Sequence, residues 1–572
     1  MGKAVSPITC GNIKLKSPYG IKQLDGLKIV KRLNEHAVLY FTGVIDEDKQ
    51  DSYVEKATVN DQIEVVQTDG EGGTVRTLFK GLVSNLGVRC VRGIYYLEAE
   101  ALSHTHSLDV KRKFRSFQNK DMSMEELINK VKEGSGAIFE DTVTNGAKLN
   151  EFTVQYDETD WMFLKRMASR LGSVLTPQAD SDKPKFWFGL PRGKDKKFKD
   201  GFHFTVNKDI SKYLILSGNS EECPEEHEFT YFDVESKYYL ELGDKVKINE
   251  KSVILVKSTA VVKNGILTFD YVFAPENGMK QNRINNILVT GASLEGKVIE
   301  LKGDTLKVEL DIDKDHSSKP SKAESCFFRY TTGYTAEGNS GWYCMPQLND
   351  FVKIYIPTAV EESAVAMSSV RKGGASNPKT GKPSMKYFQT NFGKHMKLGE
   401  TDVEFTAIEG AMHIILDEGK GIDITSSKSI LIQSDKDLVL DGKTISITAV
   451  NETIGVSCNS SSITMDGETH VKGTIVKAVG TNKAPMSLGD VLNMVKDTVM
   501  MPIEAAKGVV AMGAMIGDAA KSGTLGETCM GVVTSVPAVA GAIKVTGMDS
   551  QVETNTVMKS GKGKTGLRGV QA

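Results

Sequence analysis

The chain has 572 residues, a length that suits roughly three to five domains. Hydrophobic residues make up 40% and charged residues 25%, as in an ordinary globular protein, and the formal net charge of -2 argues against a general nucleic-acid binder. No run of eighteen apolar residues could span a membrane, the N-terminus lacks the apolar core of a secretory signal, and the seven cysteines form no CxxC pair. We therefore expect reduced thiols, no signal peptide and no cofactor.

Residues 1–100 predict an N-terminal β domain. Short segments such as HAVLYFTGVI and GIYYLEAEAL alternate between apolar and polar positions and are divided by Gly or Asp. DGEGGT, which begins at Asp69, is expected at the tip of a hairpin between two of them.

Residues 101–284 predict a second domain, of mixed α+β type, with two short helices. In DMSMEELINKVKEG, Ser123 stands three residues before Glu126, as in a capping box. In QYDETDWMFLKRMASRLG, Thr159 lies at the start and apolar residues recur at helical spacing. A glycine ends each helix, and we predict strands from there as far as Phe273.

Two groups in this second domain resemble functional sites. His104-x-His106 could suggest a metal, but two histidines that alternate on a strand are ordinary surface or interface residues. EECPEEHE, from Glu221, has the paired carboxylates that glycosidases use, yet a solvated acidic turn explains it better. No Ser/His/Asp or Cys/His arrangement has a convincing spacing, so we predict no enzyme activity and no metal site.

Residues 285–370 predict a small closed barrel of the oligonucleotide/oligosaccharide-binding (OB) type. About five short antiparallel strands fit there, with Gly303-Asp304 at the first hairpin turn. The next stretch, 371–395, contains RKGGASNPKTGKPSMK and is predicted to be a linker by composition.

Residues 396–476 contain a repeat of about eight residues, in which each unit has an apolar-x-apolar pair. Side chains two apart on a strand point to the same side, so we predict that each pair faces inward. The predicted inward residues are Ile414, Leu416, Ile422, Ile424, Ile430, Ile432, Leu438, Leu440, Ile445, Ile447, Ile454, Val456, Ile463 and Met465. His470 is the last histidine near this end, and its register puts Val471, not His470, inside.

Eight residues are too few to bury their own apolar face. A single-chain β-helix uses longer coils, because each coil must form two or three walls, whereas eight residues form one wall. Three identical chains wound together would supply the missing walls as a triangular prism. We therefore predict a trimeric, intertwined β-helix needle with a mechanical role.

Residues 477–572 predict a partly helical C-terminal extension. Ser487 is a plausible helix cap, and Pro502 should kink or break the helix. The rest is rich in Gly, Ala, Val and Thr. This extension could lengthen the needle, cradle a cargo or act as an effector, including a membrane-active one.

The order of these parts resembles the VgrG spike proteins of type VI secretion and the hub-and-spike proteins of contractile phage tails. The matching segments are SHTHSLDVKRKFRSFQNKDMSMEELI, VQYDETDWMFLKRMASRLG and SGWYCMPQLNDFVKIYI. The second is similar to a family motif, here with Thr159 where Ser is usual. Its residues in this chain are Gln155, Tyr156, Glu158, Asp160, Phe163, Leu164 and Arg166.

The resemblance implies a homotrimeric spike and baseplate hub without catalysis. Its expected partners are a hexameric inner tube protein, baseplate proteins and, transiently, the target membrane. A PAAR-type tip protein and effector cargo remain open, and no nucleic acid is expected. The resemblance also implies synthesis in a bacterial cytoplasm and export as part of an injection particle. Two alternatives stay open, a spike with a C-terminal effector and a monomeric β-helix enzyme that acts on polysaccharides.

Overall fold

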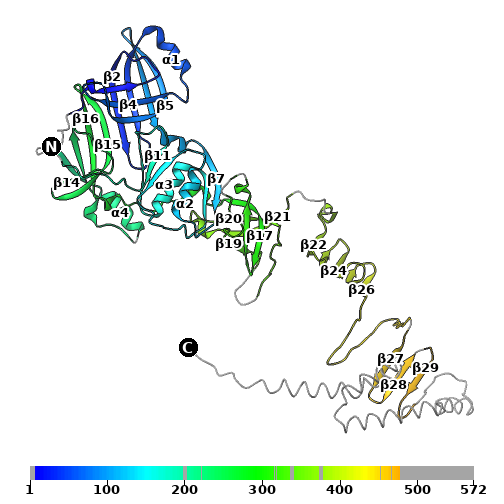
Figure 1. Ribbon diagram of the computed structural model, residues 1–572. Helices are drawn as coiled ribbons and strands as arrows, with labels where there is room; N and C mark the ends of the chain where they lie inside the picture. Colours follow the sequence, from blue (N-terminus) through cyan, green and yellow to red (C-terminus); the bar gives the residue numbers. More distant parts are fainter. Residues whose placement is uncertain are drawn as a thin grey trace, which may run out of the picture. The chain divides into compact units, whose positions relative to one another are not determined.

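The computed structural model describes residues 7–197, 202–220, 222–314, 316, 319–334, 340–372, 378–450, 452–465 and 467–476. The chain divides into two compact units, Met1–Pro378 and Lys379–Ala572. The described part is mainly β with a few short helices, as predicted (Figure 1). The predicted extension 477–572 lies outside the described residues.

An eleven-stranded sheet dominates the first unit. Its strands are β1 Ile13–Lys16, β2 Gln23–Arg32, β3 Val38–Ile45, β4 Gln62–Thr68, β5 Thr74–Val91, β6 Ile94–Ser103, β12 Phe204–Lys208, β13 Thr230–Ser236, β14 Lys245–Ile248, β15 Lys251–Lys263 and β16 Ile266–Ala274. β2 pairs antiparallel with β15, so one sheet and one apolar core span the boundary that we predicted at residue 100.

The expected hairpin at Asp69 is confirmed. It joins β4 to β5, the Asp69 amide donates to the Gly73 carbonyl at 2.9 Å, and Gly72 takes a positive φ of 86°. A short helix that the sequence pattern did not predict, α1 Gln50–Lys56, lies between β3 and β4 (Figure 1).

Both predicted helices are present with the expected caps. In α2 Met124–Lys132 the Ser123 hydroxyl accepts from the Glu126 amide at 3.1 Å. In α3 Asp160–Arg170 the Thr159 hydroxyl accepts from the Met162 amide at 3.1 Å. Their apolar faces share a core with β8 Ile138–Asp141, β10 Leu175–Pro177 and β11 Lys185–Phe188.

Two local predictions are wrong. The stretch predicted as strands contains helix α4 Ile210–Asn219, because the Asp209 carboxylate accepts from the Lys212 amide and caps it. The two histidines do not alternate on a strand, because β6 ends at Ser103 and His104–Asp109 form a 3-10 turn, η3. Ser107 stabilises this turn by donating to the His104 carbonyl at 2.9 Å.

The predicted barrel is a closed five-stranded barrel in the order β17-β18-β19-β21-β20, as in an OB fold. Its strands are β17 Ser293–Lys302, β18 Thr305–Leu310, β19 Phe327–Thr331, β20 Phe351–Tyr355 and β21 Val365–Val370. The predicted turn at Gly303 is confirmed, with a φ of 59°. We call residues 7–284, which precede the barrel, the hub. Phe152 and Val154 come from the hub and belong to the barrel core.

The second unit contains two antiparallel sheets among its described residues. The first has β22 Lys386–Gln389, β23 His395–Leu398, β24 Asp402–Ile408, β25 Met412–Asp417 and β26 Gly421–Ser426 in sequence order. The second has β27 Ile454–Cys458, β28 Ser461–Met465 and β29 Thr469–Lys472. β22 lies inside the stretch that we predicted to be a linker.

Candidate assembly interface

The five-stranded sheet of the second unit has one apolar face. Strand registers place apolar residues opposite one another on neighbouring strands, as with Phe405 and Ile414, or Ile414 and Ile424. Paired residues point to the same side of a sheet, so these side chains form one continuous surface. We call it the apolar face: Met396, Leu398, Val403, Phe405, Ile414, Leu416, Ile422 and Ile424.

This apolar face is exposed, although large aliphatic residues normally face a core. Ile414 and Leu416 are each 42% exposed, and Ile422, on the last strand, is 71% exposed. Contiguous exposed apolar surface on a protein marks an interaction site.

The opposite face of the same sheet is polar and its side chains are paired. Lys397 lies 2.7 Å from Asp402 and 3.5 Å from Glu404, and the His395 ring nitrogen lies 3.2 Å from Glu404. His395 keeps only 5% of its side chain exposed. Burial alone would raise the pKa of Glu404, but the hydrogen bond from Thr406 and the charges of Lys397 and His395 hold it below its ordinary value.

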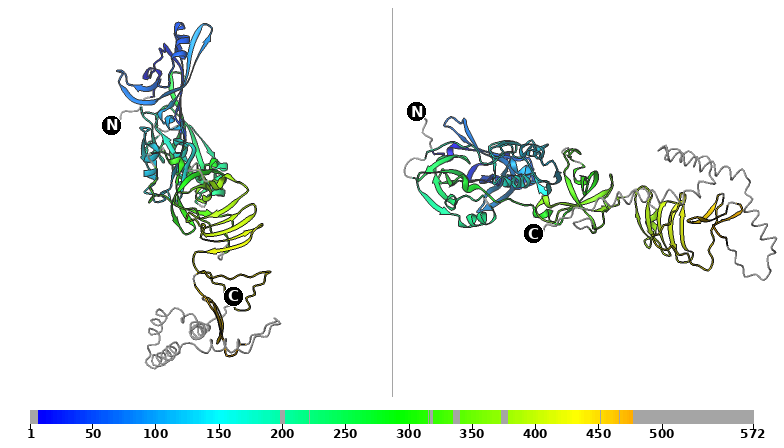
Figure 2. Two further views of the ribbon diagram at one scale, coloured as in Figure 1. Left: turned by 90° about the vertical axis from the view of Figure 1, so that its right-hand side faces the viewer. Right: turned by 90° about the horizontal axis from the view of Figure 1, so that it is seen from below.

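The sheet is therefore inverted relative to a normal domain surface. Its polar groups satisfy one another, while its apolar groups have no cover within the described chain. Figure 2 shows β22–β26 as a single stack of strands joined by hairpin turns at both edges. Such a wall suits solvent on the polar side and another protein surface on the apolar side.

The predicted inward residues fall into three groups. Ile414, Leu416, Ile422 and Ile424 lie on the apolar face. Ile430, Ile432, Leu438, Leu440, Ile445 and Ile447 lie in no strand and are exposed. Ile454, Val456, Ile463 and Met465 pair across β27 and β28, which places them on one face. Val471 is opposite Ile463 on β29, whereas His470 is opposite Thr464.

Sequence reasoning missed four members of the apolar face. Met396 and Leu398 form one apolar-x-apolar pair, and Val403 and Phe405 form another. The signal was present, because both pairs have the same form as the repeat. The spacing hid them, since Ile414 lies eleven positions after Val403 whereas the repeat has a step of about eight.

The motif residues between Gln155 and Arg166 that carry the resemblance are mostly buried and form part of the core of the first unit. Phe163 and Leu164 face the core below α3, and Tyr156 packs partly against the barrel core. Gln155 donates to the Glu158 carbonyl at 2.9 Å and to Asp160 at 3.2 Å. These residues position the fold and offer no exposed binding surface.

Arg166 and Glu158 from this motif form a buried ion pair that reaches the barrel. The Arg166 guanidinium lies 2.7 Å from Glu158 and 3.2 Å from Glu361, which belongs to η8 Glu361–Ser363 of the barrel. Arg170 lies 2.6 Å from Glu361, and burial lowers its pKa to about 10. Burial also raises the pKa of Glu158, and Arg166 opposes this rise.

Glu361 was missed because its partner lies 195 residues away in the sequence. In the sequence, Glu361-Glu362-Ser363 is typical of a solvated turn, and only the fold brings Glu361 into contact with Arg166.

Carboxylates from the barrel cap both edges of a two-stranded hub ribbon, β7 Arg112–Phe117 and β9 Thr153–Thr159. On one edge the Ser116 amide donates to Asp313 at 2.6 Å. On the other edge the Val154 amide donates to Glu361 at 2.9 Å. These bonds replace the strand partners that the ribbon lacks, and they tie the hub to the barrel.

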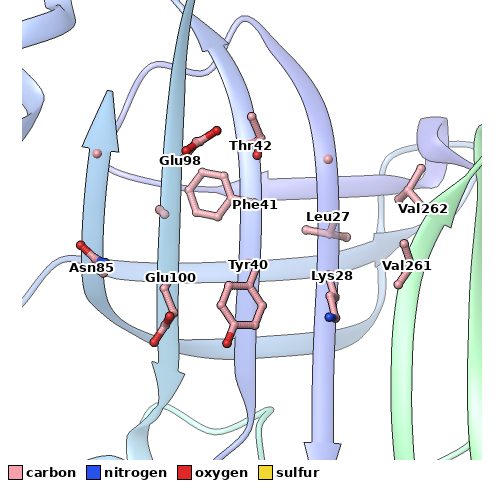
Figure 3. Close-up of a pocket in the computed structure, with 13 residues that line it drawn as sticks. Leu27, Lys28, Tyr40, Phe41, Thr42, Asn85, Glu98, Glu100, Val261 and Val262 are labelled. Carbon is pink, nitrogen blue, oxygen red and sulfur yellow. The ribbon is translucent and has the colours of Figure 1, made fainter. Parts of the chain in front are cut away.

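A shallow hollow of about 530 Å³ lies on the outer face of the large sheet (Figure 3). Glu100, Tyr40 and Lys28 lie side by side on adjacent strands there, and the Lys28 ammonium is 5.9 Å from the Tyr40 ring centroid. Ser84 donates to Glu100 at 3.0 Å. These contacts indicate a polar sheet surface.

Within the described residues, no helix is long and apolar enough to cross a membrane. No group of three or more His, Cys, Asp or Glu side chains in that same part of the chain could hold a metal ion.

The sequence matches no protein-family model and no curated protein. Solved structures that it is similar to include the E. coli c3393 protein, described as a component of the type VI secretion system with structural similarity to T4 bacteriophage tail proteins gp27 and gp5. That match has 12% identity and a TM-score of 0.43, and it covers 63% of this chain and 100% of the other.

Two further similar structures come from other bacteria. The Francisella PdpA-VgrG complex, in a half-lidded form, matches at 10% identity and a TM-score of 0.47, covering 72% of this chain and 87% of the other. A 43 kDa tail protein of prophage MuSo2 from Shewanella oneidensis matches at 11% identity and a TM-score of 0.34, covering 48% and 99%.

Proposed function

We propose that this chain is a structural spike and baseplate hub of a contractile injection system, and that it works as a homotrimer. The observation that carries the proposal is the inverted wall of the second unit, with its apolar face exposed and its polar face paired. Three such walls with their apolar faces inward form a closed prism with a dry core.

The energetics favour such burial. Each aliphatic side chain gains roughly 1.5–3 kcal/mol when it is fully buried. The eight residues of the apolar face are already about half covered by their own sheet, so they supply on the order of 5–10 kcal/mol per chain before the entropy of association is subtracted. A prism of paired strands leaves few free edges and resists unfolding, as a piercing needle requires.

In this proposal the hub of the trimer sits on a hexameric inner tube protein and on baseplate proteins. The needle punctures the target membrane, and effectors are delivered with it. A PAAR-type tip protein and a C-terminal effector in residues 477–572 are further candidates for the tip. The proposed protein is not an enzyme, and it is released as part of an injection particle.

The rival β-helix enzyme is a monomer whose own chain closes all walls around its apolar residues. The described part of the second unit supports the spike instead, because its first sheet provides one wall and leaves the apolar face without cover.

Two adjacent isoleucines on opposite faces test the proposal. Ile414 lies on the apolar face, and Ile415 lies opposite Glu404 and Asp423 on the polar face. Ile414→Lys should abolish the trimer in sedimentation, because it places a charge in the dry core. Ile415→Lys should leave the trimer intact. In the repeat, Ile430→Asp and Leu431→Asp form the equivalent pair, because adjacent residues on a strand point to opposite sides. A monomeric wild type, or equal effects of the two isoleucine variants, would contradict the proposal.

A further inference from the structure

The outer face of the barrel has exposed aromatic and cationic side chains on neighbouring strands. Successive side chains of β19 point alternately to the core and to solvent, so Phe328 is buried whereas Phe327 and Arg329 point outward. Lys307 of β18 lies opposite Phe327, and Thr305 lies opposite Arg329. Paired residues point to the same side of a sheet, so these four side chains share one outer surface.

Two cations on this surface lie on either side of one β18 residue. Lys302 of β17 and Arg329 of β19 are both opposite Thr305. Within the part of the chain that the structure describes, neither of these two cations forms an ion pair. Lys307 differs, because it lies 3.6 Å from Glu300 and its side chain is only 12% exposed. Lys302 and Arg329 are therefore available to bind an anion between them.

Aromatic rings lie on both sides of this pair of cations. The Phe327 ring is 37% exposed, and its centroid lies 5.9 Å from the Lys302 ammonium and 4.8 Å from the Lys307 ammonium. Tyr343 lies at the turn between β17 and β18, where its hydroxyl donates to the Gly303 carbonyl at 3.1 Å. This bond holds a ring that is 73% exposed at the end of the surface nearest the two cations.

The order of aromatic, cationic and aromatic groups suits a chain of rings that carry negative charges. An aromatic face packs against the apolar face of a flat ring, and ammonium and guanidinium groups bind carboxylate or phosphate. Strands β18 and β19 are the second and third strands of the barrel, and the corresponding face binds oligonucleotides and oligosaccharides in other OB folds. A single-stranded nucleic acid needs a broad positive groove, whereas Glu300 lies on this surface and the chain has a net charge of -2.

We propose that this barrel face, defined by Lys302, Phe327, Arg329 and Tyr343, binds a polysaccharide that carries carboxylate or phosphate groups. The choice of a polysaccharide rests on the proposed function, because an injection spike meets such polymers on the envelope of its target cell. All four side chains come from one copy of the chain, so binding itself does not require the trimer.

Titration of the full chain with defined polymers tests the proposal. Oligogalacturonate carries a carboxylate on each sugar ring and phosphomannan carries phosphate, so the tighter of the two identifies the charged group. Neutral cello-oligosaccharide should bind at least about 10-fold more weakly than the better acidic probe, as should single-stranded oligothymidylate. Failure of both acidic probes to bind would overturn the proposal, as would equal or tighter binding of either comparison polymer.

Single substitutions locate the site. Phe327→Ala should weaken binding of the better acidic probe about 10-fold and keep its salt dependence, whereas Arg329→Ala should weaken binding and reduce that dependence. Phe392→Ala is the matched control, because Phe392 is 81% exposed in the second unit, and it should bind like the wild type. Equal affinities of Phe327→Ala and Phe392→Ala would contradict the proposal.

Sedimentation of the same variants separates this inference from the proposed function. Phe327→Ala and Arg329→Ala should sediment like the wild type. A loss of assembly in either variant would show that another copy of the chain covers the barrel face, and this would overturn the proposed site. A monomeric wild type that binds the acidic probe would refute the trimer and leave the binding site standing.

Discussion

Removal of the Glu361 carboxylate tests whether the barrel is bound to the hub by a buried ion pair. Glu361 is 1% exposed, and it accepts from the Val154 amide at 2.9 Å and from two arginines. Loss of one partner from a buried ion pair costs about 3–5 kcal/mol. Arg166 keeps Glu158, and Arg170 keeps Glu151 at 2.9 Å, so Glu361→Ala should lose about 3 kcal/mol, the lower end of that range.

The assay is urea-induced unfolding of the full chain, compared with Glu300→Ala as a control in the same barrel. Glu300 is half-exposed and lies 3.6 Å from Lys307 and 3.8 Å from Lys322, so its loss should cost about 0–1 kcal/mol. Glu361→Gln should fall between the two, because it keeps the acceptor for the Val154 amide and loses the charge. If Glu361→Ala and Glu300→Ala shift the unfolding midpoint equally, the hub–barrel ion pair has no special role.

Three further changes have expected outcomes. Phe152→Ala removes a ring whose centroid lies 4.9 Å from that of Phe328 in the barrel core. Although Phe152 comes from the hub, its loss should destabilise the barrel by about 3–5 kcal/mol in the same unfolding assay. A loss of stability confined to the hub would count against the shared core. Thr159→Ala should cost about 1 kcal/mol in thermal unfolding, because it removes the cap of α3, and Thr159→Ser should restore it. The pKa of Glu404 is held below its ordinary value of 4.5, so its stabilising contribution is present above pH 4.5 and is lost as the pH falls through the lower, folded-state pKa. Glu404→Gln should flatten this acid dependence of the melting temperature. An unchanged slope would show that the carboxylate contributes nothing to stability.

The sequence predicted those features that depend on neighbouring residues. Ser123 and Thr159 cap the two helices because cap, first turn and apolar stripe lie within a few positions of each other. Helix α4 was missed because its apolar run also fits a strand, and the deciding Asp209 cap is a single residue. The barrel was predicted from five alternating segments and one glycine turn.

The candidate interface was predicted in part for the same reason. The period of two within each rung identified Ile414 and Ile422, whereas the irregular spacing before Ile414 hid Phe405. The contacts of Glu361 and Asp313 with the hub ribbon were beyond prediction, because each joins residues about two hundred positions apart. Such pairings depend on the complete fold.

The inverted wall has a consequence for how the protein reaches its final state. Within the described residues the apolar face has no cover, so in the proposed trimer a newly made chain cannot bury that face by folding alone. In that trimer the last step of folding is an association of chains, so the yield of assembled protein should rise with the concentration of chains. At a low concentration, unassembled chains would keep an exposed apolar surface that chaperones, proteases and wrong partners can bind.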